Sequence, residues 1–90
     1  AYNINFGTLK VGSDTTININ FEDVSHISVT KTCQCTMPTI TLLPQGGFDM
    51  LVSYDSQKVG VINQAVFERV VNNQNEQVVI TFNLKGIITE

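Results

Sequence analysis

The sequence has a large apolar side chain at every second position of Phe48-Asp49-Met50-Leu51-Val52-Ser53-Tyr54. Side chains two residues apart point to the same face of a β-strand, so this segment predicts a strand with one dry face and one wetter face. The same spacing recurs at Ile17, Ile19 and Phe21, and again at Val78, Ile80, Phe82 and Leu84. These three segments predict sheets that pack a core on one side.

Turn-forming residues separate these segments from further short strands. Gly12 to Asp14 precede the strand at 15–21, and Pro44 to Gly47 form the clearest turn of the chain before the strand at 48–54. Ile4 to Phe6 is expected to form a first strand that ends at Gly7. Gly86 predicts a bend or bulge in the last strand, which keeps pairing almost to residue 90.

Two more strands are expected in the middle of the chain. Ile27, Val29 and Lys31 alternate with polar residues and predict a third strand. Pro38 has no backbone N–H to donate, so residues 37–43 are expected to form an edge strand or an extended connection.

Residues 61–71 have apolar side chains on both faces of an extended segment. A helix is also compatible with the spacing of the valines and Ile62, but the β-branched content favours a strand. The polar turn at 72–76 returns the chain directly into the last strand.

Six or seven short strands without a convincing helix predict an all-β fold, an immunoglobulin-like antiparallel β-sandwich of about seven strands. The 90 residues form a single domain, 1–90, because there is no room for a second core.

Composition excludes several classes of partner. The net charge is −3 and five cationic residues are scattered along the chain, so no basic patch is present to bind nucleic acid. No apolar run reaches the length of a membrane helix. Charged residues make up only 14% of the chain, and a surface of amides and hydroxyls is suited to packing against other proteins.

Ala1 fits either removal of an initiator Met or cleavage after a signal peptide.

Several short motifs give the chain a family resemblance. They are, in order, Phe6-Gly7-Thr8-Leu9, Gly12, Cys33-Gln34-Cys35-Thr36, Pro44-Gln45-Gly46, Val52-Ser53-Tyr54-Asp55 and Gly60. The chain resembles a bacterial and phage family of immunoglobulin-like domains of unknown function, which is similar to the ASH and major-sperm-protein-like sandwiches. Gln34 stands where that family has a glycine, and residues 22–25 replace its usual Asn-x-Gly hairpin. The resemblance implies a seven-stranded sandwich with a scaffolding or adhesion role and no enzymatic activity.

Cys33 and Cys35 are the only candidate redox or structural thiols. In an extended strand their Cα atoms lie roughly 6.5 to 7 Å apart, at the upper limit for a disulfide, so two partly buried free thiols are favoured. A strained disulfide, an intermolecular linkage and a metal site remain as alternatives. His26 lies seven positions before Cys33 and falls on the opposite face of a continuous strand, which argues against a Cys and His catalytic pair.

Ile62, Val66 and Val70 form an apolar stripe on the second face of the ambiguous segment. The stripe either packs inside the domain or forms an exposed protein interface. Substitution of Val66 by Glu distinguishes the two, because only a core position should unfold the chain.

The sequence therefore predicts a non-enzymatic structural or protein-interaction module with no catalytic residue, cofactor or metal. The expected role is that of a virion component, such as a phage capsid auxiliary or decoration protein, which is made in the host cytoplasm and contacts capsid subunits or further copies of itself. The alternative is a periplasmic or cell-envelope module that binds protein or glycan. A small thiol-dependent enzyme is a third, less favoured candidate.

Overall fold

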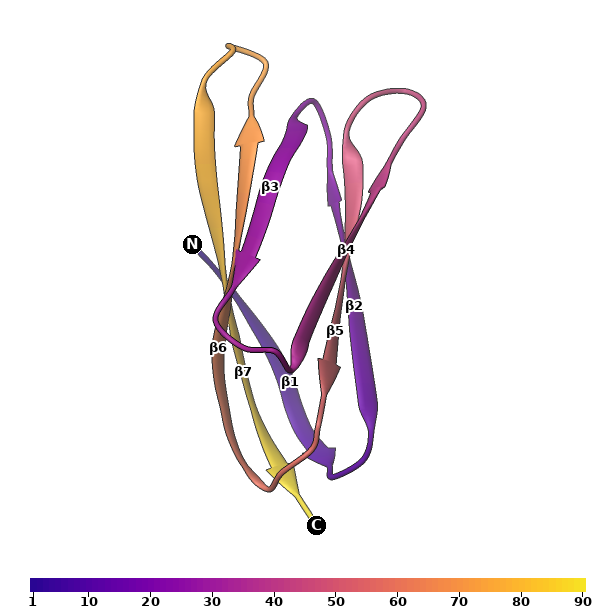
Figure 1. The fold of residues 1–90 in the computed structure, drawn as a ribbon, viewed down its shortest axis with the longest axis vertical. Helices are drawn as coiled ribbons and strands as arrows, with labels where there is room; N and C mark the ends of the chain where they lie inside the picture. The colour runs from indigo at the N-terminus through magenta and orange to yellow at the C-terminus, as the bar shows by residue number, and fades with distance from the viewer.

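The computed structural model describes residues 1–90 and contains seven strands and no helix (Figure 1). The strands are β1 (Tyr2–Lys10), β2 (Asp14–Phe21), β3 (Ser25–Lys31), β4 (Thr36–Leu42), β5 (Phe48–Asp55), β6 (Gly60–Val71) and β7 (Gln77–Thr89). The predicted all-β class is confirmed, and the ambiguous segment at 61–71 is a strand. No helix capable of crossing a membrane is present.

The strands form two sheets that pack face to face in an elongated sandwich of 46 × 22 × 19 Å. One sheet has the order β1-β7-β6-β3 and the other has the order β2-β5-β4. This order is compatible with an immunoglobulin-like domain. The sandwich is not wholly antiparallel, because β1 runs parallel to β7.

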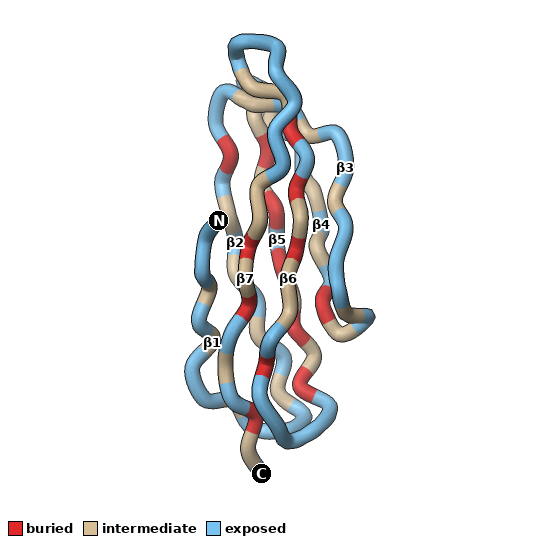
Figure 2. The backbone as a smooth tube through the Cα atoms, turned by 90° about the vertical axis from the view of Figure 1, so that its left-hand side faces the viewer, coloured by how far each residue is buried: buried red, intermediate tan, exposed pale blue.

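The core follows the two-residue spacing of the sequence. Eleven buried apolar residues form one cluster between the sheets. Along β5, β6 and β7 the buried positions alternate with intermediate or exposed ones (Figure 2). Phe48, Met50 and Val52 of the central strand β5 are completely buried. Full burial of each such side chain stabilises the fold by roughly 1.5 to 3 kcal/mol.

The first strand differs from its prediction because Gly7 does not end it. β1 continues to Lys10, and its register with β7 shifts between Asn5 and Thr8. Gly7 has φ +71°, a conformation that favours glycine, and its carbonyl oxygen lies 3.0 Å from where a Cβ of Gly86 would be. The irregularity expected at Gly86 therefore lies in β1, and Gly86 allows the close approach of the two strands.

The third strand also departs from simple alternation. Its register with β6 shifts between His26 and Ser28, so Ile27 is an extra residue in a β-bulge. As a result Ile27 faces solvent, whereas His26 and Val29 both face the interior. The expected alternation of Ile27 and Val29 on one face is wrong because the bulge changes the parity of the strand.

The fourth strand agrees with its prediction. β4 pairs only with β5, so it is an edge strand, and Pro38 lies within it. An edge position tolerates proline because one side of the strand makes no ladder hydrogen bonds.

Candidate functional site

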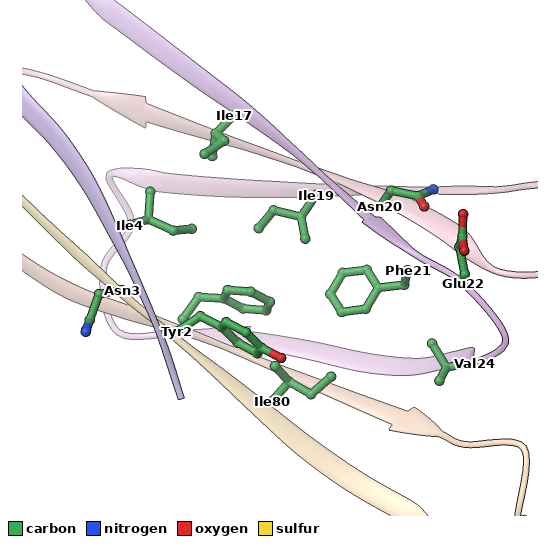
Figure 3. A pocket seen from close by; sticks show the side chains of 11 residues that line it. Tyr2, Asn3, Ile4, Ile17, Ile19, Asn20, Phe21, Glu22, Val24 and Ile80 are labelled. Carbon is green, nitrogen blue, oxygen red and sulfur yellow. The ribbon is translucent and has the colours of Figure 1, made fainter.

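An apolar groove opens between the two sheets on the side where β1 and β2 form the edges. Its volume is about 490 Å³, which lies within the range of ligand-binding pockets. It is lined by Tyr2, Asn3, Ile4, Ile17, Ile19, Asn20, Phe21, Glu22, Val24, Ile80 and Phe82. Figure 3 shows the isoleucines of β1 and β2 directed toward the rings of Tyr2 and Phe21.

The groove is open because β1 covers only part of β7. The pairing of these two strands starts at Tyr2 with Phe82, so residues 77–81 of β7 pair with β6 on one side only. Figure 2 shows β1 beside the lower part of β7. Residues 77–81 therefore have a free strand edge next to the apolar groove.

Aromatic contacts fix the shape of the groove. The Tyr2 ring stacks on Phe82 with centroids 5.6 Å apart, and Phe21 meets the same Phe82 ring edge to face at 5.9 Å. Phe21 also stacks on the fully buried Phe48 at 4.5 Å. These contacts hold the floor of the groove in a defined shape before any ligand arrives.

The lining of the groove is mostly apolar, and its titratable side chains are Tyr2 and Glu22. Glu22 is its only charged lining residue, and this carboxylate makes no ion pair within the chain. The groove can therefore accept apolar side chains and, at one end, a cation.

A buried acid–base pair lies elsewhere in the sandwich, between β3 and β6. The Glu68 side chain is 0% exposed and the His26 side chain is 21% exposed. His26 Nδ1 and Glu68 Oε1 share a hydrogen bond of 2.5 Å, and the imidazole also meets the Phe48 ring edge on at 5.4 Å. The second carboxylate oxygen, Glu68 Oε2, is buried without a hydrogen-bond partner.

Burial raises the pKa of the Glu68 carboxyl above its usual value of 4.5, and the hydrogen bond and charge of His26 oppose part of that rise. His26 reaches this carboxyl because the β-bulge at Ile27 turns it inward. Without the bulge, alternation would place His26 and Val29 on opposite faces. Glu68 is enclosed by the core and His26 is only partly exposed, so we assign the pair a structural role.

The raised pKa of Glu68 predicts a specific dependence of stability on pH. A carboxyl that holds its proton more tightly when folded stabilises the fold below its unfolded pKa, and this contribution is lost as the pH rises through the folded pKa. The free energy of unfolding should therefore fall from pH 4.5 upward. Urea unfolding between about pH 4 and pH 8 measures this slope. The Glu68→Gln variant should lack the fall, and an equal slope in both proteins would contradict the prediction.

Cys33 and Cys35 form a disulfide in the structure, so the favoured prediction of two free thiols is wrong. The prediction assumed an extended strand, but residues 32–35 lie in the connection between β3 and β4. The chain turns there and brings the two Cα atoms to 5.2 Å, within the usual range for a disulfide. The amide of Cys35 also contacts Cys33 Sγ at 3.1 Å.

The disulfide closes a very small loop and should contribute little to stability. The chain-entropy relation gives about 1.6 kcal/mol for a loop of this size. We expect the Cys33→Ser/Cys35→Ser variant to remain folded, with its free energy of unfolding lowered by no more than about 2 kcal/mol. Urea unfolding monitored by circular dichroism checks this value. Complete unfolding of the variant would show that the disulfide is essential to the fold.

Ile62, Val66 and Val70 are buried between the sheets and do not form an exposed stripe. β6 is a central strand between β7 and β3, and these residues lie on its inner face. The exposed-interface alternative is therefore wrong for these three residues. The outer face of β6 includes Val61, which is 78% exposed.

The structure contains no group of three or more His, Cys, Asp or Glu side chains that could hold a metal ion. Comparison with protein-family models, with characterised proteins and with solved structures gives no match. The fold therefore stands as an all-β sandwich, and the site must be interpreted from its own geometry.

Sequence reasoning missed two features of the site region. Glu68 lies two residues from both Val66 and Val70, so the two-residue spacing already places it on the buried face. The sequence gives less indication of the groove. Ile17, Ile19 and Ile80 were expected to face inward, but nothing in the sequence states that β1 leaves residues 77–81 of β7 uncovered.

Proposed function

We propose that this chain is a non-enzymatic structural module that binds other protein subunits, and that it serves as an auxiliary or decoration subunit of a virus capsid. The observation that carries the proposal is the apolar groove beside the free edge of β7. Apolar surface next to unpaired backbone groups is a binding surface for extended protein segments.

The surface composition supports a role in protein packing. Charged side chains are scarce, and the outer face of the β2-β5-β4 sheet presents exposed Thr16, Asn18, Thr39 and Thr41. Amides and hydroxyls lose less free energy on leaving water than ammonium and carboxylate groups do. Such a face suits close contact with a capsid shell or with further copies of the chain.

The groups that could supply catalysis are engaged in structural contacts. Both thiols are consumed in the disulfide, and the single histidine is hydrogen-bonded to a buried glutamate. Neither group lines the groove. This arrangement supports binding as the function of the groove.

The disulfide between Cys33 and Cys35 is compatible with a second location of the protein as well. Disulfides persist in the periplasm, on cell surfaces and on virions, and they are rare in the cytosol. The second candidate is therefore a periplasmic or cell-envelope module with the same protein-binding groove.

Fractionation of the source culture tests the proposal. Antibody raised against the chain is used to probe purified virions, washed cell envelopes, periplasm and cytosol. Recovery in virions, at a fixed ratio to the main capsid protein, is the expected result. Recovery in the envelope or periplasm alone supports the second candidate, and recovery in the cytosol alone contradicts both.

A further inference from the structure

We propose that the groove binds an extended segment of a partner protein that adds as a strand to residues 77–81 of β7, places alternate apolar side chains in the groove and sets a Lys or Arg beside Glu22. This inference deepens the proposed protein-binding function and rests on it. The partner is thereby defined by chemistry: about five residues in extended conformation, with apolar side chains two apart and a cation at one end.

The free edge of β7 lacks the features that protect strand edges. Residues 77–81 are Gln-Val-Val-Ile-Thr, with no proline, no charge and no bulge, and Val78 and Val79 are 41% and 46% exposed. Among the other edge strands, β1 and β3 each carry an irregularity and β4 carries Pro38, whereas β2 carries only the charge of Asp14. Natural proteins block strand edges in these ways to prevent pairing, so an unblocked edge is suited to accept a strand.

The groove supplies the side-chain pockets that such a strand needs. Ile80 and Phe82 of β7 line the groove, and Figure 3 shows Ile19 of β2 across from Ile80. A strand paired with the free edge would extend the β7 sheet over the opening between the sheets. Every second side chain would then point into the groove, and the others would point to solvent.

Charge favours a partner segment over a second copy of this chain. Glu22 is the one charged group at the groove and has no cation beside it. A second copy pairing through its own residues 77–81 would bring no Lys or Arg, and both copies carry a net charge of −3. A segment with a cation at one end neutralises Glu22 and is attracted to the acidic chain.

Two blocked hexapeptides serve as probes: acetyl-Lys-Thr-Val-Thr-Val-Thr-amide and its reverse, acetyl-Thr-Val-Thr-Val-Thr-Lys-amide, in which the lysine and the valines share one face of the strand. They allow for parallel and antiparallel addition to β7. Binding of one of them should slow hydrogen exchange of those amides in residues 77–81 that face the free edge by about tenfold or more at saturation. The same peptide with N-methyl groups on alternate amides cannot pair along that edge and should not protect those amides.

Charge reversal provides a matched test on the protein. Glu22→Lys should weaken binding of the lysine peptide by about fivefold, and a peptide with Glu in place of Lys should recover that loss. Asp14→Lys makes the same charge change at the opposite end of β2, away from the groove, and should leave the affinity unchanged.

Several outcomes would overturn the inference. They are absence of binding by both peptides, equal binding of the N-methylated peptide, and a free chain that is already dimeric with residues 77–81 protected. After either of the first two outcomes, a chain that is found in virions or envelopes would still be a protein-binding module, but it would bind through another surface. The fractionation result therefore separates failure of the groove inference from failure of the proposed function.

Discussion

The Val66→Glu variant is expected to lose the folded state at room temperature. Val66 is 0% exposed and lies opposite Phe82 on the inner face of β6. A carboxylate there would have no partner and would lie two residues from the buried Glu68 on the same face. The expected cost is about 5 kcal/mol or more, which is comparable with the whole stability of a small domain.

A matched control is present on the same strand. Val61 is 78% exposed on the outer face of β6, so Val61→Glu should change the free energy of unfolding by no more than about 0.5 kcal/mol. Circular dichroism and urea unfolding of both variants provide the comparison. The milder Val66→Ala should remain folded and lose about 2 kcal/mol. A folded Val66→Glu protein with unchanged stability would contradict the core position of this residue.

The second large effect is expected from His26→Ala. Its removal takes away the only hydrogen-bond partner of a completely buried carboxyl, since Glu68 Oε2 already has none. Leaving an ionised group buried without a partner costs about 3 to 5 kcal/mol at neutral pH. The loss should shrink at acidic pH, because the protonated carboxyl carries no charge.

A double-mutant cycle isolates this interaction. Glu68→Gln keeps the size of the side chain and removes the charge, so His26→Ala made in that background should cost only about 1 to 2 kcal/mol. Urea unfolding at neutral pH gives the four free energies of the cycle. If His26→Ala costs the same in the natural chain and in the Glu68→Gln background, the two side chains are not coupled and the assigned structural role is wrong.

The two-residue spacing predicted most of the fold, because a strand that is buried on one face has an apolar residue at every second position. Strands β2, β5 and β7 lie where alternation placed them, and Pro38 correctly marked an edge. The spacing could not reveal the bulge at Ile27, because one extra residue changes the facing of every residue before it. It also could not reveal that β1 pairs in parallel with β7, since pairing partners far apart in sequence leave no local signal.

The site was harder to predict than the fold. The disulfide depends on a local turn at 32–35 that an extended-strand assumption excludes. The groove depends on where β1 starts to cover β7, which is a property of register. The apolar residues of the groove were correctly predicted to face inward. Whether such residues contact a neighbouring strand or line an opening is decided only by tertiary structure.

The pairing of β1 with β7 also has a consequence for how the chain folds. It joins residues 2–10 to residues 82–89, so the first sheet cannot be completed until nearly the whole chain is in place. Topologies dominated by such non-local pairing fold slowly, in about milliseconds to seconds. Until β1 docks, the outer edge of β7 is uncovered along its whole length from Gln77 to Thr89. A chain in which β1 has not docked would therefore expose the longest free strand edge, and such an edge favours aggregation.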